Sequence, residues 1–423
     1  MKKLSFIAMM LIGVLASGTF VSCGSDDDGS SGSGGDNQGG SSTDTLTTME
    51  QKQLLETTAN ELMALVNVSD FQAVAEIGDY INDTETDNSA IDSFFDAGYE
   101  ACTVSSSDEL IRNLYKASNF YGVFELQSGR WRLTSTSVSY LEFNFTDGSG
   151  KSCSLRVTCS GNETTVHNDV FDDSEEDYIY RDGYGTWIET RIENSIVIPE
   201  QINVTLKQSG TTLASVSVKS SLTLANGPEF DYTTDNAEIS MTTTVSQYSV
   251  AIETFAFNAG KDASMSAKLQ KSGETLVSLD VNGTGDLSDE DNLTGSVTSN
   301  FNIMNKVRLS GSLTSIEKFN KYLERASDND YNETEFKSSL SNANALMDIK
   351  AYFNKSSVAN AYMQLYPFSS TGYYGERWDY EPVIVFADGS SYSTFESYFD
   401  EIFFDSVINK FKKLGDDFVD LVK

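Results

Sequence analysis

The spacing of apolar residues changes twice along the chain after residue 47. Residues 48–117 carry apolar side chains three or four positions apart, which predicts a helical region. Residues 120–313 alternate between apolar positions and Ser or Thr, and Cys153-Leu155-Val157-Cys159 is one such run. This alternation predicts antiparallel strands with one buried face.

Helical spacing returns in residues 314–423. There we expect two or three helices, an aromatic-rich loop at 366–381, a short strand at 383–386 and a final amphipathic helix. Helices, then many strands, then helices indicate an α+β fold. We therefore predict a large antiparallel β-sheet of about 8–12 strands, covered by N- and C-terminal helices.

One segment occurs twice: Leu206–Val218 matches Leu269–Val281 at seven of thirteen positions. Each copy has a Ser-Gly pair between two alternating runs, which predicts a β-hairpin. Two copies are too few for a solenoid, so we interpret them as two similar hairpins of one sheet. No Pro- or Gly-rich linker interrupts residues 48–423, which we expect to form a single α+β ectodomain.

The N-terminus has the layout of a secretory signal peptide over residues 1–22. Lys2 and Lys3 precede a short apolar run, and small residues follow near the cleavage position. Phe20-Val21-Ser22-Cys23 resembles the relaxed lipobox of Bacteroidetes-type surface-exposed lipoproteins, although it lacks the commoner Leu three places before the cysteine. The resemblance implies that Cys23 is lipidated and anchors the chain in the outer membrane. The alternative is an ordinary signal peptide followed by an incidental thiol.

The residues after Cys23 form a Gly-, Ser- and Asp-rich tether that ends at residue 47, and this composition predicts flexible coil. Ser25-Asp26-Asp27-Asp28 resembles the acidic export signal of the same bacterial group, which implies display on the cell exterior. The alternative is that these aspartates only keep the tether solvated. Asp44-Thr45-Leu46 resembles that group's O-glycosylation motif, which makes Thr45 a candidate modification site.

The chain is strongly acidic, with 63 Asp and Glu residues, 29 Lys and Arg residues and a net charge of −34. Binding to nucleic acid or to an anionic membrane surface needs a basic surface, so we expect neither partner. The lipid anchor is then the contact with the membrane.

The sequence offers little for catalysis. Its single histidine, His167, is expected in a surface hairpin loop, which argues against Ser-His-Asp sites and multi-histidine metal sites. Asp328-Asn-Asp330-Tyr-Asn332 starts like a calcium loop but has Glu333 in place of the glycine such a loop requires. Acidic clusters at 172–177 and 286–291 are expected to be solvated loops. We expect no cofactor, no metal and no catalytic residue.

Three cysteines remain besides Cys23, namely Cys102, Cys153 and Cys159. Cys153 and Cys159 are predicted on one strand, about 20 Å apart, too far for a disulfide unless the strand folds back. They are interpreted as small buried hydrophobic residues.

Two segments mix aromatic residues with Gly, Asp and Arg. Sugar-binding sites use flat rings against the apolar side of a pyranose, with carboxylates or arginine on its hydroxyls. The alternative is that the rings pack loops onto the sheet. The candidate ligand-binding residues are Tyr180, Tyr184, Trp187, Tyr373, Tyr374 and Trp378.

These observations favour a non-enzymatic cell-surface protein that binds glycan, peptide or another surface component. One alternative is a carrier in which a curved sheet with a helical cover holds a lipid; a second is a glycoside hydrolase with two catalytic carboxylates. An apolar cleft between sheet and helices would favour the carrier, and an open aromatic groove rimmed by carboxylates would favour glycan binding.

Overall fold

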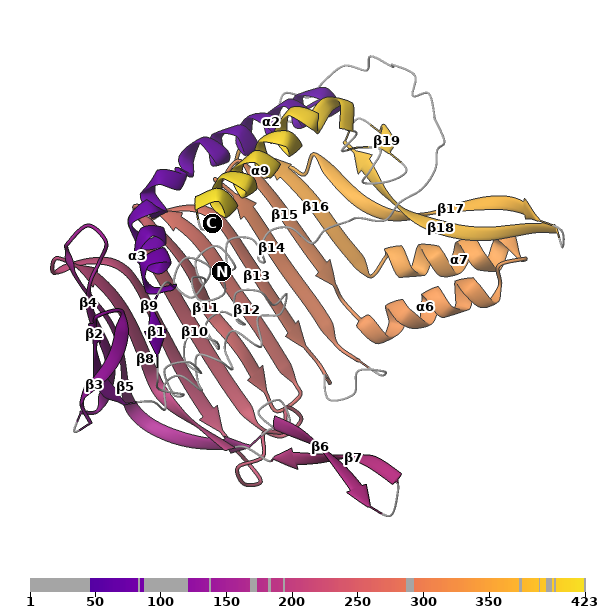
Figure 1. Ribbon diagram of the computed structural model, residues 1–423. Coiled ribbons are helices and arrows are strands. Elements are labelled where there is room, and N and C mark those ends of the chain that lie inside the picture. The colour runs from indigo at the N-terminus through magenta and orange to yellow at the C-terminus, as the bar shows by residue number, and fades with distance from the viewer. Residues whose placement is uncertain are drawn as a thin grey trace. The chain divides into compact units, whose positions relative to one another are not determined.

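A computed structural model contains two compact units, formed mainly by Val68–Gly260 (unit 1) and by residues 46–67 with Lys261–Asp417 (unit 2) (Figure 1). The expectation of a single ectodomain stays a prediction. The residues that the structure describes are 46–82, 84–86, 121–136, 138–167, 173–181, 184–192, 195–286, 293–372, 375–387, 389–392, 398 and 401–421.

Unit 1 is a mixed sheet with one short helical segment. Neighbouring strands run in the order β1-β3-β2-β4-β5-β8-β9-β10-β11; β1–β3 and β2–β4 pair in parallel and the other neighbours antiparallel. A separate antiparallel pair, β6–β7, completes the unit. The elements are η1 (Val68–Phe71), α3 (Gln72–Asn82), β1 (Glu85–Thr86), β2 (Gly122–Gln127), β3 (Arg130–Ser135), β4 (Tyr140–Thr146), β5 (Ser152–His167), β6 (Asp173–Arg181), β7 (Tyr184–Ile192), β8 (Ser195–Gln208), β9 (Thr211–Thr223), β10 (Asn236–Val245) and β11 (Tyr248–Asn258).

Apolar residues alternate with polar residues along the strands of unit 1, so one face of its sheet is buried. Phe143, Leu155 and Leu206 occupy directly opposite positions on β4, β5 and β8, and all three are fully buried. The helical segment joins this core, because the Tyr80 ring of α3 stacks on Phe145 at 6.2 Å. The opposite face carries Ser, Thr, Asn and charged side chains, as period-two alternation requires.

In the part of unit 2 that the structure describes, an antiparallel sheet runs in chain order from β12 to β19, together with four helices. Its elements are α2 (Thr48–Leu65), β12 (Asp262–Lys271), β13 (Glu274–Thr284), β14 (Ser296–Ile303), β15 (Val307–Leu313), α6 (Ile316–Asp328), α7 (Glu333–Asn344), β16 (Met347–Phe353), β17 (Ala361–Gly372), β18 (Gly375–Phe386), β19 (Ser391–Tyr392) and α9 (Glu401–Leu421).

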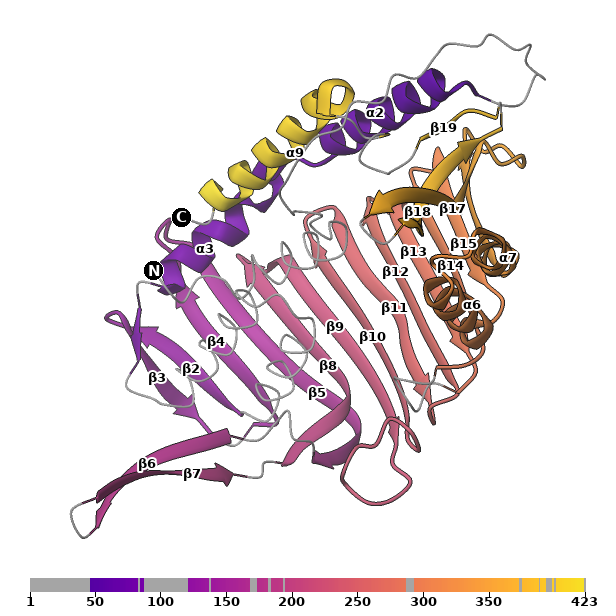
Figure 2. The ribbon, with the colours of Figure 1, turned by 90° about the vertical axis from the view of Figure 1, so that its right-hand side faces the viewer.

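Helix α2 follows the ends of the unit 2 strands (Figure 2). The Lys271 ammonium at the end of β12 donates to the Leu65 carbonyl at 2.7 Å, and Lys306, between β14 and β15, forms an ion pair with Glu61. Nearer its start, Leu55 packs against the buried cluster that contains Phe386. The capping box of Thr47 and Glu50 fixes where this helix begins.

The repeated segment forms two hairpins, as predicted, one in each unit: β8–β9 and β12–β13. Both two-residue turns have positive φ at both positions, 49° and 81° at Ser209-Gly210 and 50° and 84° at Ser272-Gly273. Positive φ at both central residues is typical of the type I′ turn, whose twist matches that of the strands it joins. The Ser-Gly pair therefore specifies the same local geometry twice.

The predicted α+β class with a large, mainly antiparallel sheet is confirmed, but four local expectations are wrong. The expected aromatic loop at 366–381 lies in the long hairpin β17–β18, and Met347 and Ile349, expected at the end of a helix from their spacing, lie in β16 (Met347–Phe353). His167 ends β5 instead of lying in a loop, and most of the acidic cluster at 172–177 belongs to β6. Pairing with neighbouring strands overrides the local Gly, Ser, Pro and Asp content in the hairpins.

Within the described residues, both ends of the chain contain the expected helices, but 85–86 form strand β1 within the region predicted as helical. Helices α2 and α3 account for part of residues 48–117, and α9 is the expected final helix. Residues 87–120, and with them Cys102, lie outside the described residues. Across the helices that the structure describes, none has the length and apolar character needed to span a membrane.

Candidate functional site

The β17–β18 hairpin of unit 2 has one face that packs against helices. Trp378 and Tyr380 on β18 lie with their ring centroids 6.3 and 6.5 Å from that of Phe336 on α7. Lys337 adds a cation–π contact, with its ammonium 4.2 Å from the Trp378 ring centroid. Leu365 on β17 completes the buried cluster. This face fixes the hairpin to the helix pair, as Figure 1 shows for α7 beside β17 and β18.

The opposite face of the same hairpin presents aromatic rings to solvent. Tyr366 and Phe368 on β17 are 58% and 40% exposed. They lie directly opposite Glu381 and Asp379 on β18. Directly opposite residues share a face with Cβ atoms about 5 Å apart, so each ring stands beside a carboxylate. We call Tyr366, Phe368, Asp379 and Glu381 the aromatic–acidic face.

The connection between α6 and α7 braces one end of this face. Arg377 Nε donates to Asp330 Oδ2 at 2.6 Å, and the Trp378 backbone N–H donates to the Asp330 carbonyl at 2.6 Å. Asn332 caps α7 by accepting from the Glu335 N–H at 3.3 Å. The residues that begin like a calcium loop therefore position a helix and a strand.

The structure separates the aromatic residues that the sequence analysis selected. Trp378 belongs to the packed face, where its ring lies beside Phe336 and the Lys337 ammonium. Its assignment as a ligand-binding residue stays a prediction. The backbone of Tyr180, Tyr184 and Trp187 lies in β6 and β7, with Tyr178 rather than Tyr180 opposite Trp187. The side chains of these three residues lie outside the described part of the chain, as do Tyr373 and Tyr374 and the N-terminal candidates Cys23, Ser25, Asp26, Asp27, Asp28 and Thr45.

Sequence reasoning missed Tyr366 and Phe368 as candidates, although it quoted their segment. The signal was available: Tyr366-Pro-Phe368 places two rings two positions apart, and Trp378-Asp379-Tyr380-Glu381 alternates rings with carboxylates. Alternation of this kind predicts a strand with rings on one face of β18 and acids on the other. The register of β17 and β18, which places the acids opposite Tyr366 and Phe368, is known only from the tertiary structure.

A second surface of unit 2 is apolar and only partly covered. On β13 to β16, directly opposite positions carry Leu279, Phe301, Leu309 and Ala351. Leu309 is 43% exposed and the other three are half-buried. Two positions further along β15 and β16, near the strand ends that α2 follows, Val307 lies directly opposite Phe353, and both are buried. The open part of this row is called the apolar sheet face below.

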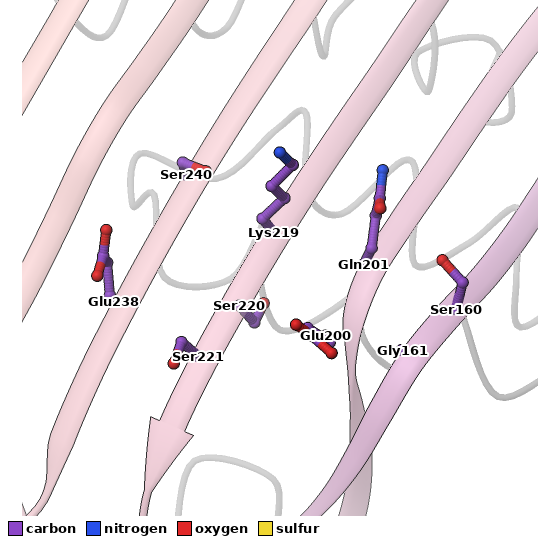
Figure 3. Close-up of a pocket in the computed structure, with 9 residues that line it drawn as sticks. All are labelled: Ser160, Gly161, Glu200, Gln201, Lys219, Ser220, Ser221, Glu238 and Ser240. Atoms are coloured by element: carbon purple, nitrogen blue, oxygen red, sulfur yellow. The ribbon is translucent and has the colours of Figure 1, made fainter.

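Unit 1 contains a polar hollow of about 450 Å³ on the outer face of β5, β8, β9 and β10 (Figure 3). Gln201, Lys219 and Ser240 lie on directly opposite positions of three adjacent strands. Two residues further along the paired strands β9 and β10, Ser221 lies directly opposite Glu238. The lining residues are Ser160, Gly161, Glu200, Gln201, Lys219, Ser220, Ser221, Glu238 and Ser240.

A bulge in β5 shapes one side of this hollow. The register between β5 and β8 shifts between Ser160 and Glu163, and Gly161 has a φ of 87° that suits glycine. The Asn162 N–H donates to Glu200 Oε2 at 3.1 Å. The bulge thus fixes the Glu200 carboxylate at the rim.

The predicted strand carries two cysteines, the buried Cys153 and the half-buried Cys159, and neither forms a disulfide. Burial, together with the neighbouring Asp147 carboxylate, raises the pKa of the Cys153 thiol to about 11. A thiol is nucleophilic only as its thiolate, so Cys153 is unsuited to nucleophilic catalysis near neutral pH. Its role in the buried row of β5 is packing.

Three or more His, Cys, Asp or Glu side chains placed to hold a metal ion are not found among the residues with described positions. Comparison with known proteins adds no relative: no family model, no curated protein and no solved structure matches this chain. The functional argument therefore rests on the surfaces of the molecule itself.

Proposed function

We propose that this chain is a lipid-anchored protein of the cell surface that binds glycan, without chemical conversion, through the aromatic–acidic face. The observation that carries the proposal is the pairing of two exposed rings, Tyr366 and Phe368, with two carboxylates directly opposite them. Exposed rings set beside hydrogen-bond acceptors match the two sides of a pyranose.

The arrangement suits a chain of sugars better than an isolated one. Residues two positions apart on a strand are about 6.8 Å apart, so Tyr366 and Phe368 can contact neighbouring sugar units. The Asp379 and Glu381 carboxylates can then accept hydrogen bonds from hydroxyl groups. The packed face of the hairpin holds these groups in position before a ligand arrives, which lowers the entropic cost of binding.

The location is proposed from the sequence. Cys23 is the last residue of a lipobox-like tetrad, and the aspartates at 26–28 resemble an export signal for the outer face of the outer membrane. The Gly-, Ser- and Asp-rich composition after Cys23 predicts a tether whose span, about 25–30 Å, would hold the folded units away from the headgroups. At this location the aromatic–acidic face would be exposed to polysaccharide outside the cell.

The test is binding of the full mature chain, purified in detergent, to an array of polysaccharides and oligosaccharides. We expect Tyr366→Ala and Phe368→Ala each to weaken binding of a retained glycan by about tenfold, equivalent to about 1.4 kcal/mol. Tyr232→Ala is the matched control, because Tyr232 is an exposed tyrosine (50%) of unit 1. Unchanged retention by both hairpin variants, or equal loss in the control, would contradict the proposal.

A second candidate is a carrier of lipid or another hydrophobic ligand, favoured by the apolar sheet face around Leu309. Exposed apolar patches of this kind often mark interaction sites. Mass spectrometry of lipid extracted from the purified chain tests it: Leu309→Asp should reduce the amount of copurified lipid, and Tyr366→Ala should not. The absence of copurified lipid from the unaltered chain would eliminate this candidate.

A further inference from the structure

We propose that the polar hollow of unit 1 is a binding site for a small zwitterion that carries an ammonium and a carboxylate on the same carbon, namely a free α-amino acid. The proposal concerns a surface separate from the aromatic–acidic face and goes beyond glycan binding. It rests on the hollow of about 450 Å³, a volume within the range of small-molecule sites.

The first observation is the placement of opposite charges. Lys219 on β9 lies directly opposite Ser240 on β10, and Glu238 lies two positions from Ser240 on the same strand. Lys219 and Glu238 are therefore diagonal neighbours, about 7–8 Å apart at their Cα atoms. Figure 3 shows both side chains rising from the floor of the hollow without meeting.

The second observation concerns the charge of Lys219. Among the residues that the structure describes, the Lys219 ammonium forms no ion pair and no hydrogen bond. Its neighbours in the row are the Gln201 amide and the Ser240 hydroxyl, which are uncharged. A ligand carboxylate at this point would receive a charge-assisted hydrogen bond from the ammonium and a second bond from the amide.

The third observation concerns the opposite side of the hollow. Glu238 faces Ser221 across the β9–β10 ladder, which places a carboxylate beside a hydroxyl. An ammonium group donates up to three hydrogen bonds, and these two side chains are suitable acceptors. A ligand with its own charges in the reverse order therefore spans the diagonal between Lys219 and Glu238.

The lining also disfavours other ligand classes. The hollow has no aromatic ring on which a sugar could stack. The Glu200 and Glu238 carboxylates would repel a phosphate or other polyanion, and the Lys219 ammonium would repel a metal cation. The fixed Glu200 carboxylate at the rim adds a second negative group that favours ligands with a net positive or neutral charge.

The experiment is isothermal titration of the full mature chain in detergent with glycine, L-alanine and L-glutamine at low ionic strength. Acetate and methylamine serve as probes that carry only one of the two charges. We expect measurable binding of at least one amino acid and about tenfold or greater loss for both single-charge probes. The proposal is overturned if methylamine binds with the same affinity as glycine. It is also overturned if no amino acid gives a heat of binding at millimolar concentration.

Variants locate the site. Lys219→Met and Glu238→Gln should each weaken amino-acid binding about tenfold or more, and Lys219→Arg should retain most of it. Lys207→Met is the control, because Lys207 is an exposed lysine on the same polar face but outside the hollow. Far-ultraviolet circular dichroism checks that each variant is folded. Equal affinity of Lys219→Met and the unaltered chain places binding elsewhere and refutes the assignment.

Discussion

Phe368 on β17 lies directly opposite Asp379 on β18, and Tyr366 repeats the relationship with Glu381 two positions further along. Both rings of this face thus lie on β17, and both carboxylates lie on β18. The opposite face of the hairpin is held by Phe336 on α7. Because the packed face supports the strand that carries the exposed rings, a ligand need not order these rings when it binds, and the entropic cost of binding is lower.

The carboxylates of the aromatic–acidic face should contribute to glycan affinity. We expect Asp379→Asn and Glu381→Gln to weaken binding by about 1 kcal/mol each, because an amide oxygen is a weaker acceptor than a charged one. The measurement is a titration with a glycan retained in the array experiment. Each variant keeps the shape of its side chain, so unchanged affinity in both would show that only the rings matter.

Hydrolysis offers a separate check on the same residues. A glycosidase would lose its activity on removal of either carboxylate, whereas a binding protein releases no sugar from the outset. We expect no reducing ends to appear when the chain is incubated with a bound glycan. If the unaltered chain released sugar and Asp379→Asn did not, the result would favour a glycoside hydrolase.

Trp378 should act in stability and not in ligand recognition. Its ring packs beside Phe336 and under the Lys337 ammonium, so Trp378→Ala is expected to lower the free energy of unfolding by about 2–3 kcal/mol. Tyr366→Ala, on the exposed face, should change it by no more than about 0.5 kcal/mol. Urea denaturation measures both. Equal stability of the two variants would contradict a stabilising role for Trp378, and a larger loss for Tyr366→Ala would mean that the two faces of the hairpin are reversed.

Asp147 should make the stability of unit 1 depend on pH. Burial raises the pKa of its carboxyl, but hydrogen bonds from the Lys151 N–H, from Ser149 and from Gln208 outweigh burial and lower the pKa to about 2. The unfolded value is about 3.9, so the contribution is fully present above about pH 4 and is lost as the pH falls towards 2.

Asp147→Asn removes this titration and provides the comparison. The unaltered chain should be more stable than the variant at pH 6, and the difference should shrink between about pH 4 and pH 2. Chemical denaturation at a series of pH values gives the result. A difference that stayed constant over that range would show that Asp147 stabilises by shape and not by charge.

Gly285 and Gly295 should not tolerate a side chain. They have φ values of 147° and 97°, and a Cβ added at Gly295 would overlap the Thr284 carbonyl oxygen and the Gly285 backbone. We expect Gly295→Ala to destabilise unit 2 by more than about 2 kcal/mol. Gly273→Ala, in an open turn with positive φ, tests strain without overlap and should cost less. Thermal melting compares the two, and equal losses would point to backbone strain alone.

The anchor prediction concerns Cys23. Cys23→Ala should release the chain from the membrane fraction, because the acyl chains provide the membrane affinity. Replacing Asp26, Asp27 and Asp28 with Ala should leave the chain lipidated but protected from protease added to intact cells. Firm membrane attachment of the cysteine variant would refute the anchor, and unchanged surface cleavage of the aspartate variant would limit those residues to a tether.

The hairpins show how far local pattern specifies this fold. The alternation around Cys153 and Leu155 gave the buried face of β5, and the Ser-Gly pairs gave both type I′ turns. The same reasoning failed at 366–381, where Pro367, Gly372 and several serines predicted a loop. In the structure these residues pair along the whole length of β17 and β18. Strand pairing is non-local, so its stabilisation is not visible in the composition of one segment.

The sequence by itself determined the α+β class, the type of most elements, the two related hairpins and the expectation of a lipid anchor. These properties depend on periodicity, turn residues and short motifs, which are local. Tertiary structure alone decided that Trp378 is packed while Tyr366 and Phe368 are exposed, and that Lys219 stands diagonal to Glu238. Strand register and the position of α7 set those relationships, and both depend on contacts between residues far apart in the chain.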